Sequence, residues 1–294
     1  MPTPEKKLPN VLITGGTDGL GRGAAEFLAA RGYRVFAGSR NAERRAELAK
    51  FAQEKKLPIE VLPLDVTNDA SVDAAVAEAE RRAGSVDVLI NNAGIAIGAV
   101  MEEISIADLR KQFDTNFFGA VRVSQRVLPG MRRRGRGRII NMSSIAGKVS
   151  SPLMGPYSAS KHALEAFSDS LRLELYSFGI PVVMIEPGFI PTSINRNAAE
   201  LSSAYASNAE KSAYRGIYQG FLGAWQKTTK ASRYTPEDCA RVILRAIEDT
   251  PPRARYLVTK EAKITNALKS LLSDRAFDRI LIKRLGLSSP EQKS

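Results

Sequence analysis

The chain has 294 residues with 43 Lys and Arg, 31 Asp and Glu, and a formal net charge of +12. This length is sufficient for one large hydrophobic core, so we expect a single domain. No apolar run reaches the roughly 20 residues of a membrane-spanning helix, and the N-terminal residues lack the apolar stretch of a signal peptide. One cysteine, Cys239, and one histidine, His162, favour a cytoplasmic protein without a metal site.

The positive charge is concentrated in two segments. Residues 251–294 contain ten basic and four acidic side chains, and five arginines lie within residues 132–138. Cations are favourable at the C-termini of helices, which accounts for such clusters without a ligand. Because no nucleic-acid-binding motif accompanies the charge, we predict no nucleic-acid partner.

Short apolar segments alternate with amphipathic ones along the chain. Strands are predicted at residues 10–14, 33–38, 59–62, 86–90, 138–142 and 180–185. Helices are predicted at residues 21–31, 41–55, 69–82 and 106–131, and from about residue 152 onward. The last helix has apolar residues at helical spacing, which we interpret as its buried face: Ala163, Phe167, Leu171, Leu175 and Phe178. This alternation predicts an α/β fold with a doubly wound parallel sheet covered on both faces.

Small or polar residues follow each predicted strand. In open parallel sheets, ligands bind at the carboxyl ends of the strands. After the first strand come Gly15, Gly19 and Gly21, and a helix follows them directly. Glycines at such a turn let the backbone approach a pyrophosphate, whose charge is stabilised by the helix N-terminus. The strand, the turn and the helix together predict a nucleotide site.

The end of the second strand distinguishes between the two nicotinamide dinucleotides. An acidic residue there would bind the ribose 2′-hydroxyl of NAD, whereas a basic residue suits the 2′-phosphate of NADP. The chain has Ser39 and Arg40 at this point and no acid before Glu43. We therefore predict NADP(H) as the cofactor.

A candidate acid–base pair lies on the long helix after the fifth strand. Tyr157 and Lys161 are four residues apart and share one helix face. An ammonium beside a phenol lowers the pKa of the phenol below its ordinary value of about 10, which favours proton exchange near neutral pH. Ser144, at the end of the fifth strand, can hydrogen-bond the substrate oxygen with which Tyr157 exchanges a proton. Alone, this spacing is common on helix surfaces, so the assignment depends on the other motifs.

Several motifs together resemble the short-chain dehydrogenase/reductase family. They are Thr14-Gly15-Gly16-Thr17-Asp18-Gly19-Leu20-Gly21, Asn91-Asn92-Ala93-Gly94, Asn116, Ser144, Tyr157 with Lys161, and Pro187-Gly188 with Thr192. The resemblance covers roughly residues 8–192 and 234–258. It implies a Rossmann-type sheet of about seven strands, ending with residues 255–258. It also implies a homodimer or homotetramer.

The resemblance implies specific roles for these residues. Tyr157 would exchange the proton, Lys161 would lower its pKa, Ser144 would polarise the substrate oxygen and Asn116 would hold a water. The implied catalytic residues are Asn116, Ser144, Tyr157 and Lys161. The implied cofactor-binding residues are Gly15, Thr17, Asp18, Gly19, Leu20, Gly21, Ser39, Arg40, Asp65, Val66, Asn92, Ala93, Gly94, Tyr157, Lys161, Pro187, Gly188, Ile190 and Thr192.

Two segments extend beyond the shared motifs. Residues 193–233 are aromatic-rich and are interpreted either as a substrate-covering lid or as two ordinary surface helices. Residues 261–294, which follow the catalytic domain of residues 1–260, carry apolar stripes broken near Ser273 and Asp274. Packing of this helical extension on the protein is favoured over peripheral membrane contact through residues 261–287. The extension resembles those of family members acting on steroids, retinoids or long-chain aldehydes.

Apolar residues near the expected pocket predict a lipophilic substrate. They are Ile95, Ile97, Met101, Met154 and Phe189. The leading hypothesis is an NADP(H)-dependent oxidoreductase that interconverts a lipophilic ketone or aldehyde and its alcohol. The alternative is a non-catalytic NADP(H)-binding protein that regulates or senses redox state.

Overall fold

The computed structural model describes residues 8–287; the N-terminal seven residues and the end of the predicted extension, residues 288–294, lie outside this range. Its centre is a seven-stranded sheet in the order β3-β2-β1-β4-β5-β6-β7, with all neighbouring strands parallel. The strands are β1 Val11–Thr14, β2 Val35–Ser39, β3 Ile59–Pro63, β4 Val88–Asn91, β5 Arg138–Met142, β6 Val182–Glu186 and β7 Arg255–Leu257. The predicted doubly wound parallel sheet is confirmed.

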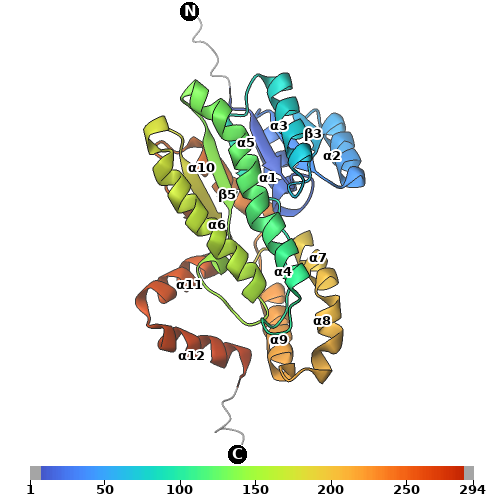
Figure 1. Ribbon diagram of the computed structural model, residues 1–294, viewed down its shortest axis with the longest axis vertical. Helices are drawn as coiled ribbons and strands as arrows, with labels where there is room; N and C mark the ends of the chain where they lie inside the picture. The colour runs from blue at the N-terminus through green and yellow to red at the C-terminus, as the bar shows by residue number, and fades with distance from the viewer. Residues whose placement is uncertain (1–7, 288–294) are drawn as a thin grey trace, which may run out of the picture.

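Successive strand residues point into two separate hydrophobic clusters. In β1, for example, Val11 and Ile13 belong to one cluster and Leu12 to the other. The first cluster lies under α1 Gly19–Ala29, α2 Ala42–Lys55 and α10 Pro236–Glu248. The second lies under α3 Asp69–Ala83, α5 Gly119–Arg134 and α6 Gly155–Glu174. Because helices cover both faces (Figure 1), the central strands β1, β4 and β6 are buried along their whole length.

The long helix predicted over residues 106–131 is present and contains one wider turn. It begins as α4 Ile106–Phe113, widens into a π-helix, η1 Asp114–Phe118, and continues without a break as α5. Apolar periodicity predicts such a helix but does not reveal a single wider turn. Such turns are frequent at functional sites. Here the π-helix contains Asn116, whose side chain is almost completely buried.

The predicted buried face of α6 also needs correction. The helix begins at Gly155 and ends at Glu174, and Phe178 lies beyond it in a 3-10 turn, η3 Tyr176–Phe178, with 44% of its surface exposed. The buried face instead includes polar residues, among them Ser160, Lys161 and Ser168. Asn116 donates to Ser160 Oγ (3.1 Å), and Asn141 donates to Ser168 Oγ (2.8 Å). These partners make polar burial on α6 acceptable, so an apolar stripe alone does not mark this face.

The remaining helices lie at the carboxyl end of the sheet, below it in Figure 1. One group is α7 Ser193–Leu201, α8 Ser203–Asn208, the 3-10 turn η4 Ala209–Lys211, and α9 Arg215–Ala231. The region of residues 193–233 thus forms three helices rather than two. The other group, α11 Lys260–Leu271 and α12 Asp274–Leu285, confirms the predicted break at Ser273 and Asp274.

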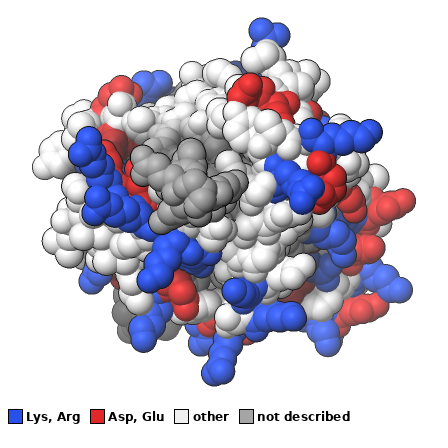
Figure 2. Space-filling model, turned by 90° about the horizontal axis from the view of Figure 1, so that it is seen from below, with Lys and Arg blue, Asp and Glu red and all other residues white. Residues whose placement is uncertain are grey.

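The C-terminal helix packs on the helix α9. A Cβ at Gly220 of α9 would overlap the carbonyl oxygen of Leu285 in α12, and Phe277 and Leu285 are buried. This contact shows packing of α12 on the protein, although Leu271 and Ile264 of α11 remain exposed. Seen from this end, Lys and Arg side chains lie around the edge of the face, with Asp and Glu side chains between them (Figure 2). Within residues 8–287 no helix is both long and apolar enough to cross a membrane.

Candidate active site

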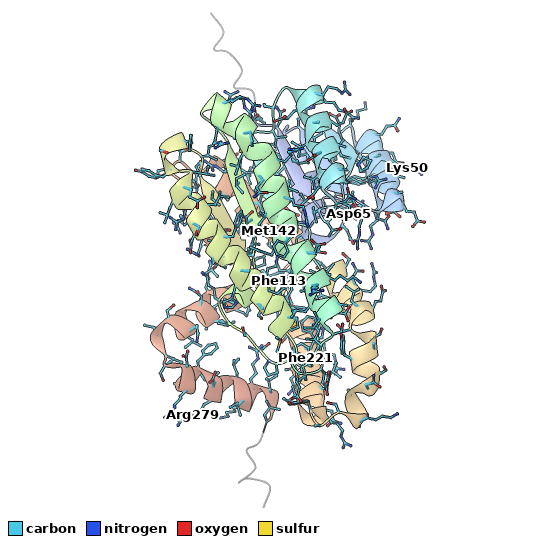
Figure 3. All side chains as sticks on the ribbon, in the orientation of Figure 1. Lys50, Asp65, Phe113, Met142, Phe221 and Arg279 are labelled. Atoms are coloured by element: carbon cyan, nitrogen blue, oxygen red, sulfur yellow. The ribbon has the colours of Figure 1, made fainter. Side chains whose placement is uncertain are left out.

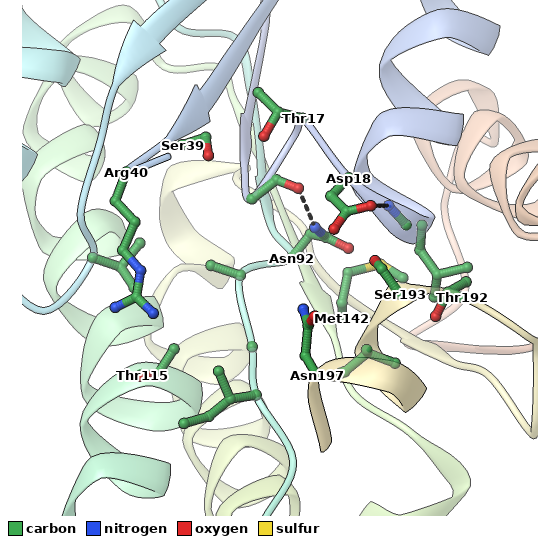
Figure 4. A pocket seen from close by; sticks show the side chains of 18 of the residues that line it. Thr17, Asp18, Ser39, Arg40, Asn92, Thr115, Met142, Thr192, Ser193 and Asn197 are labelled. Carbon is green, nitrogen blue, oxygen red and sulfur yellow. Dashed lines mark hydrogen bonds between the residues drawn. The ribbon is translucent and has the colours of Figure 1, made fainter. Parts of the chain in front are cut away.

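A pocket of about 330 Å³ opens at the carboxyl ends of the strands, where Figure 3 places Asp65 and Met142. The first turn of α7 borders it opposite the strand ends (Figure 4). Most of the predicted cofactor residues line this pocket: Gly15, Thr17, Asp18, Gly19, Leu20, Ser39, Arg40, Asp65, Val66, Asn92, Ala93, Gly94, Tyr157, Lys161 and Thr192. Predicted residues outside its lining are Gly21, Asn116, Ser144, Pro187, Gly188 and Ile190.

The glycine turn between β1 and α1 has the geometry of an anion site. Gly15 and Gly19 have φ angles of +63° and +53°, which side chains with a Cβ rarely adopt. Gly21 faces the turn from inside α1, and a Cβ there would overlap the Gly15 carbonyl oxygen. Asp18 caps the helix by accepting from Gly19 N at 2.8 Å. Only glycines therefore allow α1 to begin so close to the turn, with its amides facing the pocket.

Asn92, after β4, holds this turn in place. Its side-chain amide donates to Thr14 O (2.9 Å) and Gly15 O (3.1 Å). In return, Thr14 Oγ1 accepts from the backbone N–H groups of Asn92 and Ala93, both at 2.9 Å. The geometry of the turn is thus built from the ends of two strands, β1 and β4, that are distant in sequence but adjacent in the sheet.

The end of β2 places cations at one end of the pocket. Arg40 is exposed, extends into the pocket (Figure 4) and makes no hydrogen bond or ion pair with other residues of the 8–287 range. Ser39 is buried and accepts from Asn41 N at 3.2 Å. Arg44, on the first turn of α2, pairs with Asp18 of the glycine turn. A free guanidinium beside a second one fits the 2′-phosphate of NADP.

Asp65 and Val66 line the pocket after β3, beside Leu64. The Asp65 carboxylate accepts from the backbone N–H of Thr67 (3.0 Å) and from its hydroxyl (2.8 Å). The backbone N–H of Asp65 donates to Ser71 Oγ at 2.9 Å. These bonds fix the loop so that it forms one wall of the pocket.

Tyr157 and Lys161 both line the pocket from α6. The Lys161 Nζ donates to Met142 O at 2.7 Å and lies 5.6 Å from the centroid of the Tyr157 ring. Burial lowers the pKa of Lys161 to about 8, opposed by attraction to Glu165. Burial raises the pKa of Tyr157 to about 12, opposed by the neighbouring Ser144 hydroxyl.

The predicted lowering of the pKa of Tyr157 was therefore wrong for this state of the protein. Loss of solvation disfavours the phenolate, and this effect exceeds that of the hydrogen bond with Ser144. The Lys161 ammonium is bound to Met142 O. Tyr157 is the neutral phenol at neutral pH. It therefore carries a proton, which the raised pKa makes harder to release.

Ser144 and Asn116 lie beside the pocket rather than in its lining. Ser144 Oγ accepts from Ala146 N at 3.1 Å and begins the 3-10 turn η2 Ile145–Gly147. Asn116 accepts from Ile95 N (2.8 Å) and donates to Ile95 O (2.9 Å). With its bond to Ser160, it joins the loop after β4 to the helix that carries Lys161.

The predicted cofactor residues after β6, from Pro187 to Thr192, lie partly in the pocket and partly in the core. Gly188 packs against the start of α11, because a Cβ there would overlap Thr259 Oγ1, which caps that helix. Ile190 is buried in the core, and Pro187 O accepts from Ile145 N at 2.9 Å. Only Thr192 reaches the pocket, where its N–H donates to Asn195 Oδ1 (3.0 Å) at the start of α7.

The pocket also contains residues that the motifs did not predict. They are Asn41, Arg44, Leu64, Ile95, Thr115, Met142, Ser143, Ser193, Ile194 and Asn197. Arg44 was detectable, since it follows Arg40, a predicted cofactor-binding residue, in the first turn of a predicted helix. Ser193, Ile194 and Asn197 enter only because α7 folds back over the strand ends.

Comparison with known proteins agrees with this geometry. Residues 9–202 match the family described as short chain dehydrogenase. The chain is 38% identical over 277 residues to the uncharacterized oxidoreductase YusZ of Bacillus subtilis, covering 93% of this chain and 97% of that protein. It is 34% identical over 281 residues to the NADPH-dependent 3-dehydrocapnine reductase of Ornithobacterium rhinotracheale, covering 93% and 96%.

A solved structure shares the fold over most of both chains. Actinorhodin polyketide ketoreductase with NADPH aligns with a TM-score of 0.72 and 31% identity, covering 85% of this chain and 95% of that one. The seven-stranded parallel sheet, the glycine turn and the matched sequence together show that this chain belongs to the short-chain dehydrogenase family of oxidoreductases.

Proposed function

We propose that the protein is an NADP(H)-dependent oxidoreductase that interconverts a lipophilic ketone or aldehyde and the corresponding alcohol. One observation carries the proposal: Tyr157 and Lys161 line the same pocket as the glycine turn and Arg40. A nucleotide held at its phosphates and its adenosine ribose would extend toward the acid–base pair. The nicotinamide, when bound, supplies or accepts the hydride.

The free guanidinium of Arg40 supports NADP(H) over NAD(H). It faces the pocket beside Ser39, and Arg44 lies one turn further along on α2. No carboxylate lies at the end of β2 to accept bonds from an unphosphorylated ribose. Two similar proteins agree with this choice, since one is named an NADPH-dependent reductase and the other was solved with NADPH.

The acid–base step falls to Tyr157. Its neutral phenol would donate a proton to the carbonyl oxygen during reduction, and Ser144 would hydrogen-bond the same oxygen. Lys161, anchored to Met142 O, keeps its amine beside the tyrosine ring. Asn116 holds the loop after β4 against α6, so that the pocket wall and the acid–base pair keep their spacing.

An apolar environment near the pocket supports a lipophilic substrate. Phe189 packs edge-on against Trp225 (4.9 Å between centroids), and Phe221 stacks on the same ring (5.7 Å). Ile95 lines the pocket, whereas Ile97 is completely buried and contributes only to the core. We also propose that α7 to α9 cover the substrate and that the enzyme is a homodimer or homotetramer in the cytoplasm.

The test is a turnover panel. The purified protein is mixed with NADPH and aldehydes and ketones of increasing apolar chain length, and loss of the NADPH absorbance is followed. Turnover should increase with chain length and be slower with NADH. Tight NADPH binding without turnover of any carbonyl would instead support the non-catalytic sensor.

A further inference from the structure

Two buried carboxyl groups lie behind the active site and have no role in the chemistry above. Glu165 is on α6, one helical turn after Lys161, and Glu186 is the last residue of β6. Only 5% of Glu165 and 1% of Glu186 are exposed. Acids are rarely buried to this degree unless they are paired.

Two cations are shared between these acids. Lys148, after η2, places Nζ 3.0 Å from Glu165 Oε2 and 3.8 Å from Glu186 Oε1. Arg255, in β7, places Nε 3.1 Å from Glu165 Oε2 and 3.3 Å from Glu186 Oε1. Arg255 is also bound to Asp169 on α6 at 2.6 Å, so its charge is divided among three carboxylates.

The surroundings do not satisfy both acids as anions. Among the described residues, Glu165 Oε1 and Glu186 Oε1 accept no hydrogen bond. Helix α11, which packs on η2 and β7, brings no charge to this side; near Gly188 it presents Thr259, its cap, and Ala262, both buried. Burial and the neighbouring Glu165 raise the pKa of Glu186 to about 7, although Lys148 and Arg255 oppose the shift. Glu186 therefore exchanges its proton near neutral pH beside a second buried carboxyl group.

A short structural path joins this pair to the active site. Lys161 is bound to Met142 O, and the adjacent Ser143 has a buried hydroxyl without a hydrogen-bond partner among the described residues. A Cβ at Gly147 would lie 2.7 Å from Ser143 Oγ and 3.0 Å from Glu165 Cγ, so this hydroxyl and the Glu165 side chain border the same glycine. The attraction of Glu165 also raises the pKa of Lys161 against the effect of burial.

We propose that Glu165 and Glu186 are positioning residues that share one proton beneath the active site, and that the remaining negative charge keeps Lys161 as the ammonium beside Tyr157. Only the expected effect of this pair on turnover rests on the proposed function. The shared proton and the charge of Lys161 are properties of the protein without substrate.

The first experiment needs no activity. In protein labelled with ¹³C in Glu and Lys, the carboxyl carbons of the pair and the Cε of Lys161 are titrated by NMR. In the wild type, a buried carboxyl should titrate near neutral pH. In Glu165→Gln, the midpoint of Lys161 should fall by roughly one pH unit, as expected for loss of a nearby opposite charge. Glu186→Gln should abolish the near-neutral carboxyl titration.

Asp169→Asn is the matched control, because it removes a carboxylate from the same Arg255 outside the pair. It should leave the near-neutral titration in place and shift Lys161 much less than Glu165→Gln does. If Glu165→Gln does not fold, Glu186→Gln still decides the shared proton. An unchanged Lys161 midpoint in Glu165→Gln, or no carboxyl titrating near neutrality in the wild type, overturns the proposal.

The second experiment measures the pH profile of kcat/KM with NADPH and an active carbonyl. The wild-type profile should bend at the midpoint of the pair, and Glu186→Gln should remove that bend while Asp169→Asn keeps it. A merely structural loss would lower the profile evenly at all pH values, which counts against the proposal. If no carbonyl is turned over, the proposed function fails while the NMR titrations still decide this inference.

Discussion

At the scale of single residues, the protonation of Tyr157 decides which step the site can begin. Burial keeps it as the phenol, with a pKa raised to about 12, while the pKa of Lys161 is lowered to about 8 by the same cause. In the proposed reduction the phenol would be the acid, and its raised pKa makes it a weaker acid than an ordinary tyrosine. The hydroxyl of Ser144 lies beside the phenol and lowers its pKa, but this effect is smaller than the increase caused by burial.

Tyr157→Phe keeps the ring and removes the proton donor. Turnover should fall by the ~10²–10⁴-fold that general acid–base groups contribute. NADPH affinity, measured by fluorescence titration, should remain close to that of the wild type because the ring still forms the pocket wall. Near-normal turnover in this variant would rule out Tyr157 as the acid.

Arg40→Asp reverses the charge that would face the 2′-phosphate of the proposed cofactor, NADP(H). Charged hydrogen bonds contribute roughly 1.5–3 kcal/mol, so the Kd for NADPH should rise by about ten-fold or more. Binding of NADH should change little and become competitive. Lys55→Asp makes the same charge change at the exposed end of α2, away from the pocket, and is the control. Equal losses in both variants would mean that Arg40 acts only through net charge.

At the scale of elements, the helices beyond the sheet are joined by a close backbone contact. Glycine occurs three times on α9, at Gly216, Gly220 and Gly223, but only Gly220 meets the Leu285 carbonyl of α12. The other two have open space where a side chain would lie. Tyrosines of the same region bind acids of the loop before α4, as Tyr218 does with Glu103 at 2.7 Å.

Substitution of these glycines by alanine separates the docking of α12 from helix propensity. Gly220→Ala should displace α12 and increase proteolysis within residues 260–287. Gly216→Ala and Gly223→Ala should be neutral or stabilising by roughly 0.5–1 kcal/mol, because alanine favours a helix interior. Limited proteolysis and thermal unfolding measure both effects. The same behaviour in all three variants would contradict the close contact of α9 and α12.

At the scale of the whole molecule, buried charge makes stability depend on pH. The pKa of Glu186 is raised from its ordinary value of 4.5 to about 7 in the folded protein. The folded state therefore binds the proton more tightly than the unfolded state. The resulting stabilisation is complete below pH 4.5 and is lost as the pH rises through about 7.

Glu186→Gln mimics the protonated acid and tests this dependence. The free energy of unfolding of the wild type should decrease relative to the variant between pH 4.5 and 7, by on the order of 3 kcal/mol. Urea unfolding at a series of pH values measures the difference. Parallel pH curves for the two proteins would show that Glu186 has an ordinary pKa in the folded state.

The sequence alone was sufficient for the sheet and for one end of the site. Apolar and amphipathic patterns are local, so they predict the individual strands and helices. Their alternation predicts a parallel sheet, because the helices between successive strands cover both of its faces. Gly15 and Gly19 were equally readable, since a positive φ disfavours side chains whatever surrounds the turn, and Gly21 is needed because its Cα lies close to the Gly15 carbonyl oxygen. Tyr157 and Lys161 line the same pocket because residues four positions apart on a helix lie on the same face.

Only the tertiary structure decided features that depend on distant segments. The pKa of Tyr157 rises because of burial contributed by other elements, which a helical spacing cannot express. Arg44 reaches Asp18, and Glu165 lies beside Glu186, through the order of strands in the sheet. The π-helix at Asn116 and the exposure of Phe178 likewise follow from packing partners. Local pattern determines elements, whereas burial and charge are set by what the fold places around each side chain.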